Sequence, residues 1–529
     1  MLARPGRWGD HRSTCMAIPK TPRDSVLDVL RDPEIRRLLD SPEHQGLELS
    51  HSRQIYANRG LQMDQIALLG FDMDYTLAVY SMRQIEELAF RMTLDRLVAH
   101  RGYPAFLRNL SYDHEFVIRG LVVDKAYGNI FKMDRHNHVG RCYHGRRQLS
   151  LDERRALYQT NEKIRLSLPR FAWIDTLFSL PEACLYAEII EAQEAHGEKV
   201  DYHKVYDDTR ECIDEVHRDG SLKSEVRKDL GRFIKPDPEL APALHKLRSG
   251  GKKLFVLTNS LWDYTEGVMS FLLDGRLPEY PSWRNYFDYV VVGAQKPAFF
   301  AEQRPFIELN PNGTVARPQP ETLERGKIYE GGNLFDFERM TGFAGERVLY
   351  VGDHIYGDII RNRKASQWRT CFVVQELERE IEYIDAHAED VLRLNELDDL
   401  RARLDDMINH HKLLLNALDR RMERGGPLPA DLEARRQREK QDLEKLRRAF
   451  KATLIEGAEL EARFESGANA YWGLVFKEGN ENSRFGEQVQ DYADLYTSRV
   501  SNFLYYSPMQ VFRSPRATMA HERPALRHA

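Results

Sequence analysis

The chain has 529 residues, 42% of them hydrophobic and 30% charged, which is enough to bury a large core in two or three structural units. Its 77 Lys and Arg residues against 82 Asp and Glu residues leave a net charge of -5, which excludes the basic surface of a nucleic-acid or membrane-surface binder. No apolar run is long enough to span a bilayer, and the five cysteines lack metal-ligand spacing. We therefore expect a soluble, cytoplasmic protein with neither nucleic acid nor membrane as a partner.

The N-terminal residues 1–45 are predicted to be a poorly ordered tail. Residues 1–20 hold several Arg residues but no apolar segment, so they are not a secretory signal. An Arg-rich start is compatible with a transit peptide, and also with a tail that precedes a true start at Met16. We favour the tail.

Four short apolar runs have the pattern of buried strands in a parallel sheet. They are Ile66–Leu69, Leu254–Leu257, Tyr289–Val292 and Val348–Val351. Each run ends directly in a polar or Gly-containing turn. Because ligands of open α/β sheets bind at the carboxyl ends of the strands, catalytic residues are expected just after these runs.

About 180 residues separate the first two runs, far more than the dozen or so that a parallel crossover needs. Residues 46–80 and 245–390 are therefore predicted to form the catalytic core, and residues 81–244 an inserted α+β cap. Within the cap, Phe116–Arg119 and Leu121–Asp124 have the composition of strands.

Residues 391–466 are rich in Leu, Arg, Glu and Lys, with apolar residues at helical spacing. Gly425–Pro429 interrupts this pattern, which predicts an antiparallel helical hairpin. Its charges indicate either a solvated surface or a contact with another subunit. Residues 467–529 are expected to pack back on the core.

Carboxylates follow the first and fourth runs. Asp72 and Asp74 come after the first, and Asp353 and Asp358 after the fourth. One carboxylate of an Asp-x-Asp pair can attack phosphorus while the other transfers a proton, and carboxylate oxygens are the ligands that Mg²⁺ prefers. Each pair alone is equally typical of loop and helix-capping residues.

The second and third runs are followed by groups that suit a phosphate. Thr258, Asn259 and Ser260 offer hydroxyl, amide and backbone N–H donors, and Lys296 offers a compensating charge. Taken alone, Thr-Asn-Ser is an ordinary helix cap, and a Lys before Pro is an ordinary surface residue.

The order Asp-x-Asp, Thr, Lys and Gly-Asp-x4-Asp, each at a predicted strand end, resembles the haloacid dehalogenase (HAD) superfamily. The resemblance implies a Rossmann-like core in which Asp72 is the nucleophile that forms an aspartyl-phosphate, and Asp74 is the general acid and base. It implies that Thr258 and Asn259 hold the phosphate, with Ser260 beside them, and that Lys296 offsets charge. It further implies a Mg²⁺ cofactor bound by Asp72, the backbone carbonyl of Asp74, Asp353 and Asp358.

The cap contains a polar stretch in which Arg210, Asp214 and His217 fall on one helical face, with Lys223 just beyond. An exposed Arg–Asp pair on a solvated helix would have the same spacing. Longer segments, however, resemble the cytosolic purine 5′-nucleotidase family that prefers IMP and GMP. These segments are Asp72–Tyr80, Tyr127–Asn129, Asp175–Glu182, Gly352–Ile355 and Tyr492–Tyr496.

This second resemblance implies that Phe178, Arg210, Asp214, His217 and Lys223 hold the base. A 6-oxopurine offers acceptors at N7 and O6 and a donor at N1, so Arg210 and Asp214 complement it whereas adenine reverses the polarity. Phe178 and His217 are expected to sandwich the ring.

The family resemblance also implies phosphate transfer to nucleosides and a homo-oligomer, dimeric or tetrameric. Asp491 stands where the family's nucleotide-effector site has a basic residue, and Tyr356 replaces a Phe, which argues against effector control. Two alternatives stay open: a HAD phosphatase acting on another small phosphate ester, and a non-catalytic scaffold that assembles through the hairpin.

Overall fold

The computed structural model describes residues 33–39, 49–158, 164–166, 168–360, 362, 365–517 and 519. The chain divides into two compact units, residues 1–50 and 51–529. The first contributes helix α2 (Pro33–Leu39). Most of the predicted N-terminal tail, including the possible transit peptide and Met16, lies outside the described residues.

A ten-stranded sheet forms the core of the second unit, in the order β1-β20-β17-β16-β3-β11-β12-β15-β13-β14. The seven strands from β20 to β15 are parallel, and β1, β13 and β14 are antiparallel to their neighbours. The bounds are Tyr56–Ala57 (β1), Leu495–Thr497 (β20), Arg369–Val373 (β17), Val348–Gly352 (β16), Leu68–Phe71 (β3), Lys253–Leu257 (β11), Tyr289–Val292 (β12), Ile328–Gly331 (β15), Phe306–Leu309 (β13) and Val315–Pro318 (β14).

The four predicted strands are β3, β11, β12 and β16, and β3 begins two residues later than expected. They are adjacent in the sheet, and successive residues point into two different core clusters: Leu69 and Val256 into one, Leu68 and Phe255 into the other. Burial on both faces explains why these strands are continuous apolar runs. Gly70 is required in β3, because a Cβ there would lie 2.1 Å from the Phe255 ring.

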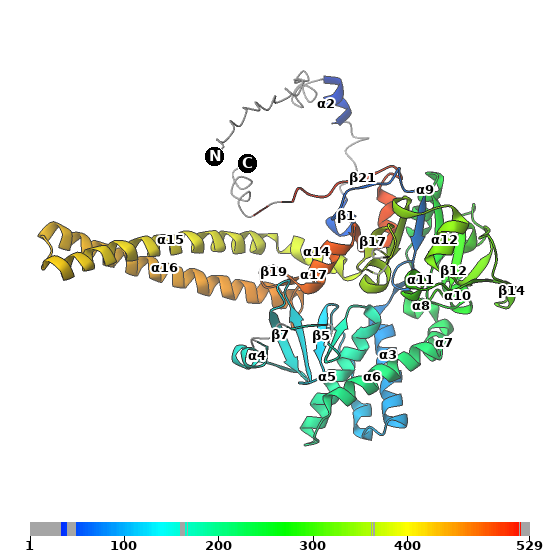
Figure 1. Cartoon of the computed structure of the whole chain (residues 1–529), viewed down its shortest axis with the longest axis horizontal. Coiled ribbons are helices and arrows are strands. Elements are labelled where there is room, and N and C mark those ends of the chain that lie inside the picture. The colour runs from blue at the N-terminus through cyan, green and yellow to red at the C-terminus, as the bar shows by residue number, and fades with distance from the viewer. Residues whose placement is uncertain are drawn as a thin grey trace, which may run out of the picture. The chain divides into compact units, whose positions relative to one another are not determined.

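Helices and short 3₁₀ or π turns connect and cover these strands (Figure 1). The helices are α9 (Leu240–Ser249), α10 (Trp262–Leu273), α11 (Ala298–Ala301), α12 (Leu334–Thr341), α14 (Glu376–Ala386) and α17 (Arg484–Tyr492). The turns are η1 (His51–Arg53), η4 (Trp283–Tyr286), η5 (Gly345–Arg347), η6 (Ile355–Ile360) and η7 (Val500–Tyr505).

The insertion between β3 and β11 contains a five-stranded antiparallel sheet in the order β8-β7-β6-β5-β9. Its strands are Arg147–Gln148 (β8), Val139–His144 (β7), Asn129–Met133 (β6), Leu121–Asp124 (β5) and Phe171–Ile174 (β9). Its helices are α3 (Met82–His100), η2 (Ala105–Asn109), α4 (Leu151–Tyr158), η3 (Leu177–Ser179), α5 (Leu180–Ala195), α6 (Tyr202–Arg218), α7 (Ser221–Lys228) and α8 (Leu230–Phe233). The predicted strand at Phe116–Arg119 is wrong: this segment is turn and loop, and only Leu121–Asp124 is a strand.

Two long helices, α15 (Ala388–Gly425) and α16 (Ala430–Ala468), run side by side as an antiparallel hairpin (Figure 1). Arg393 bonds Glu456 near one end, and Arg436 bonds Asp419 near the other. None of the described helices combines the length and the apolar character needed to cross a membrane.

The segment after the hairpin does more than pack on the core, because β20 is a strand of the main sheet. The remaining strands form short pairs: β4 (Val79–Tyr80) with β10 (Ile234–Lys235), β2 (Leu61–Gln62) with β21 (Val511–Phe512), and β18 (Lys477–Glu478) with β19 (Glu481–Asn482). The arrangement confirms the predicted α/β class: a Rossmann-like core built on a large parallel sheet, with an α+β insertion between β3 and β11 and a C-terminal helical hairpin.

Candidate active site

Four adjacent parallel strands place the predicted catalytic residues at one edge of the sheet. Asp72 follows β3, Thr258 follows β11, and Asp353 follows β16. Lys296 lies in the loop after β12. Residues separated by up to 281 positions thus meet, because parallel strands end at the same edge.

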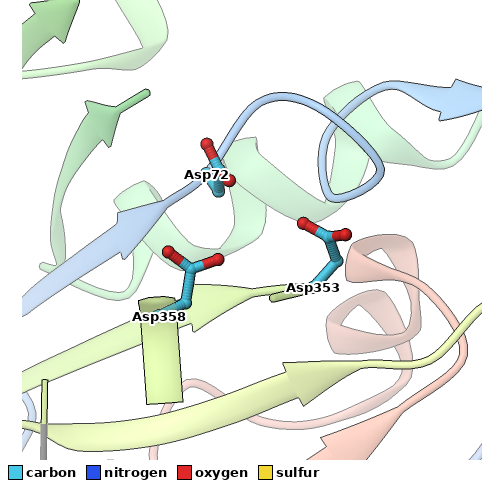
Figure 2. A group of neighbouring side chains, drawn as sticks. All are labelled: Asp72, Asp353 and Asp358. Carbon is cyan, nitrogen blue, oxygen red and sulfur yellow. The ribbon is translucent and has the colours of Figure 1, made fainter. Parts of the chain in front are cut away.

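Asp72, Asp353 and Asp358 are buried, and each offers an oxygen atom within 4.8 Å of the other two (Figure 2). Among the described residues, the Asp353 Oδ2 atom has no hydrogen-bond partner although it is buried. Three carboxylates with an unsatisfied oxygen fit a hard divalent cation such as Mg²⁺. The approach of Asp358 depends on Gly352, where a Cβ would lie 2.5 Å from the Asp358 Oδ2 atom.

The electrostatics of this cluster also favour a cation. Burial raises the pKa of Asp72 to about 7, with the neighbouring Asp358 and Asp74 adding to the rise and Lys296 opposing it. Burial, together with Asp72 and Asp358, raises the pKa of Asp353 well above its ordinary value. Crowded buried carboxylates therefore resist ionising together unless positive charge is supplied.

Lys296 supplies part of that charge. Its Nζ atom lies 2.9 Å from Asp72 Oδ2 and 2.7 Å from Asp358 Oδ1, and it also donates to the Tyr350 hydroxyl at 2.8 Å. Burial lowers the pKa of Lys296, but the two carboxylates outweigh burial and raise it overall. Lys296 is therefore a permanent cation beside the predicted nucleophile.

The carboxylate of Asp74 accepts hydrogen bonds from two hydroxyl groups. The Tyr80 hydroxyl donates to its Oδ1 atom at 2.6 Å, and the Ser260 hydroxyl donates to its Oδ2 atom at 2.5 Å. Tyr80 also shares a 2.8 Å hydrogen bond with the hydroxyl of Tyr264. Both oxygens of the Asp74 side chain are thus engaged by hydroxyl groups, which leaves its backbone carbonyl as the atom for the metal role that the HAD resemblance implies.

The predicted phosphate-binding residues lie beside this cluster. Thr258 is buried, and its hydroxyl accepts the Ser260 N–H at 3.1 Å, a role that a hydroxyl can combine with donation to a phosphate oxygen. The Asn259 side chain is engaged with the Lys296 backbone: it donates to the carbonyl at 2.9 Å and accepts from the N–H at 2.5 Å. Asn259 therefore fixes the Lys296 loop.

The residues predicted to hold the base are also brought together. Phe178 lies in η3, Arg210 and His217 lie in α6, and the rings of Phe178 and His217 are 5.3 Å apart. Lys223 in α7 donates to the Ser260 hydroxyl at 2.9 Å. This bond connects the cap to Asp74, since Ser260 contacts both.

The predicted sandwich is not formed, because the Phe178 and His217 rings meet edge to face at 84° and leave no slot between them. Burial and the nearby Lys223 lower the pKa of His217 to about 4, so its ring is neutral at pH 7. Its Nε2 atom has no partner among the described residues, although it is buried.

Arg210 donates to Asp214 at 3.3 Å, as its helical spacing suggests, and also to the fully buried Glu182 at 2.8 Å. No role was predicted for Glu182, Tyr80 or Tyr264. Tyr80 and Glu182 lie within the segments that resemble the nucleotidase family, which is the signal that marks them.

Comparison with known proteins relates most of the chain to one family. The 5′ nucleotidase family matches residues 55–524. A 5′-nucleotidase domain-containing protein 2 of Rattus norvegicus is 31% identical over 526 residues (96% of this chain, 88% of the relative). That of Homo sapiens is 30% identical over 505 residues (93% and 90%), and a 5′-nucleotidase domain-containing protein of Dictyostelium discoideum is 29% identical over 489 (90% and 77%).

Among solved structures, a predicted phosphoglycolate phosphatase of Haemophilus somnus aligns with 59% of this chain and 86% of its own. Its sequence identity is 14% and its TM-score 0.26. The match to the family and the relatives, which extends over nearly the whole described chain, rests on sequence. The chain therefore belongs to the 5′-nucleotidase family.

Proposed function

We propose that this protein is a Mg²⁺-dependent 5′-nucleotidase that hydrolyses purine nucleoside monophosphates, with preference for IMP and GMP. Family membership supports nucleotide phosphatase activity, and hence a phosphoric monoester hydrolase. The observation that carries the mechanism is the buried Asp72, which forms an ion pair with Lys296 and lies close to the carboxylates of Asp353 and Asp358.

In the first step, an Asp72 oxygen forms a bond to phosphorus while the bond from phosphorus to the 5′ oxygen breaks. The leaving oxygen takes a proton from Asp74. In the second step, water attacks phosphorus, gives a proton to Asp74, and the bond to Asp72 breaks, which releases phosphate. A bound Mg²⁺ would offset the charges of the phosphate and the attacking carboxylate.

The neighbours of Asp74 suit both of its protonation states. A hydroxyl can accept as well as donate, so Tyr80 and Ser260 can donate to the carboxylate and accept from the carboxylic acid. Lys296 remains charged throughout and stabilises the phosphoryl group in transfer.

Base selectivity is proposed to come from Arg210 and Asp214, which complement the O6 and N7 acceptors and the N1 donor of a 6-oxopurine. The contact of Arg210 with buried Glu182 holds the guanidinium in place and leaves further N–H groups for the base. Adenine presents the opposite polarity at these positions, so it would gain no hydrogen bonds from Arg210 and Asp214 and would bind less well.

The direct test is phosphate release from IMP, GMP, AMP, CMP and sugar phosphates by wild type and Asp72→Asn, with Mg²⁺ or EDTA. We expect release concentrated on IMP and GMP, dependent on Mg²⁺ and absent in the variant. Release mainly from other esters would retain the catalytic core but refute the substrate, and release without metal would refute the Mg²⁺ requirement. No release from any ester would favour a non-catalytic scaffold.

Two further assays test the base specificity and the transfer of phosphate to a nucleoside acceptor. Asp214→Ala is expected to lower the preference for IMP over AMP, and an unchanged preference would refute the base assignment. Inosine added as acceptor is expected to capture phosphate from the Asp72 intermediate in competition with water, as measured by transfer from labelled GMP.

A further inference from the structure

A buried arginine lies directly behind the predicted metal ligands. The Arg119 side chain is fully buried, and its Nη1 atom donates to the backbone carbonyl of Asp353 at 2.9 Å. Its Nε and Nη2 atoms donate to the two carboxylate oxygens of Glu376, at 2.7 and 2.5 Å. One guanidinium thus bridges a carboxylate to the backbone of Asp353.

The surroundings fix this guanidinium in one orientation. The rings of Phe372 and Phe485 each lie 5.3 Å from its Cζ atom. The next residue, Gly120, has a φ of +89°, and a Cβ there would lie 2.5 Å from the Phe485 Cβ atom. Only glycine lets the chain turn so closely beneath Phe485, and this turn directs Arg119 inward.

The two hydrogen bonds from Arg119 to Glu376 form a fork, and Glu376 is suited to accept them. It is the first residue of α14, where the helix dipole favours a carboxylate. The paired oxygens match the planar fork of the guanidinium, which gives the contact directional rigidity that a Lys could not supply. Because the pair is neutral overall, it places little net charge beside a bound cation.

We propose that Arg119, held by Glu376, is a positioning residue that fixes the backbone of Asp353 and thereby directs its carboxylate at the divalent metal. The proposal rests on the proposed function, because it requires that Asp353 bind the metal. Groups that orient metal ligands commonly contribute 10–100-fold to metal affinity.

A purely electrostatic role predicts that the two variants change the cation affinity in opposite directions. Loss of the Arg119 charge in Arg119→Met would strengthen cation binding, whereas loss of the Glu376 charge in Glu376→Gln would weaken it. Positioning predicts that both variants weaken binding, since either change breaks the fork. A role confined to stability predicts a lower melting temperature and an unchanged metal affinity of the folded protein.

The test is Mn²⁺ binding to the full-length protein, followed by the EPR signal of free Mn²⁺, with folding checked by circular dichroism. We expect the Kd for Mn²⁺ to rise on the order of tenfold in both variants. The KM for IMP at saturating Mg²⁺ is expected to stay near the wild-type value. If Arg119→Met does not fold, Glu376→Gln carries the test, because its side chain is partly exposed.

A matched control exists in the cap sheet, where Arg170 forms the same fork with the buried Asp124, at 2.7 and 2.5 Å. Arg170→Met is expected to lower stability and leave the Kd for Mn²⁺ unchanged. Tighter or unchanged Mn²⁺ binding in either site variant, or equal weakening in the control, would overturn the proposal. A wild-type protein that binds no Mn²⁺ would instead refute the proposed metal site itself.

Discussion

Among single residues, Gly352 matters because the proposed metal site leaves no room for a side chain at this position. Gly352 lies beneath Asp358, so Gly352→Ala would push the carboxylate away from Asp72 and Asp353. We expect the Mg²⁺ concentration for half-maximal phosphate release to rise on the order of tenfold. Gly267→Ala in α10 is the control, since a Cβ there meets nothing within 4 Å. A Mg²⁺ requirement equal to that of wild type would contradict this account.

A buried acid gives a pH dependence of stability. Burial raises the pKa of Glu86 from 4.5 to about 7, although a hydrogen bond from Tyr112 opposes the rise. The folded state therefore holds this proton more tightly than the unfolded state does. The stability contributed by the protonated acid is complete below pH 4.5 and is lost as the pH rises to about 7.

Glu86→Gln cannot ionise, so its melting temperature relative to wild type is expected to rise between pH 4.5 and about 7 and then level off. Thermal unfolding of both proteins across this range measures the difference. A difference that does not vary with pH would show that Glu86 does not titrate in this window.

At the scale of elements, the hairpin is held by a narrow apolar seam. Ile408, Leu415 and Leu443 form a small cluster of their own, separate from the main core. Leu443→Ala is expected to cost about 2–5 kcal/mol of local stability, which would show as faster proteolysis within α15 and α16. Because no proposed site residue lies in these helices, phosphate release should be unchanged. If Leu443→Ala also lost phosphate release, the hairpin would have a catalytic or assembly role.

At the scale of the whole molecule, one loop after the hairpin binds both the cap and the core. The buried Lys132 of β6 donates to the carbonyls of Trp472 and Leu474, at 2.9 and 2.5 Å, and to that of Lys477. From the core, Glu380 of α14 accepts the Val475 N–H of the same loop at 2.5 Å. Hydrogen bonds through this loop therefore link the cap, the core and the C-terminal segment.

Lys132→Met would leave three carbonyls without this donor and the Glu478 carboxylate, 3.4 Å away, without its cation. We expect a loss of about 3–5 kcal/mol of unfolding free energy, as is usual when one partner of a buried pair is removed. Urea unfolding followed by tryptophan fluorescence measures it. A loss of unfolding free energy below about 1 kcal/mol would indicate that this loop does not hold the cap and the core together.

The amino-acid sequence alone was enough to predict the four central strands, the carboxylates that follow them, the inserted cap and the hairpin. These features are local, because apolar runs, the turn residues at their ends and helical spacing can each be recognised within a short stretch of sequence. The helical face of Arg210, Asp214 and His217 was predictable for the same reason.

Which distant groups complete the proposed site depends on how the whole chain folds. Arg119 meets Glu376 across 257 positions, and Ser260 meets Asp74 across 186, contacts that no local pattern encodes. The edge-to-face contact of Phe178 with His217, where a sandwich was expected, likewise depends on how η3 packs against α6. The strand β20 lies in a segment predicted only to pack back on the core, because its three residues carry too little pattern to mark a strand. It joins the main sheet through backbone hydrogen bonds to β17, and backbone pairing is independent of side-chain identity.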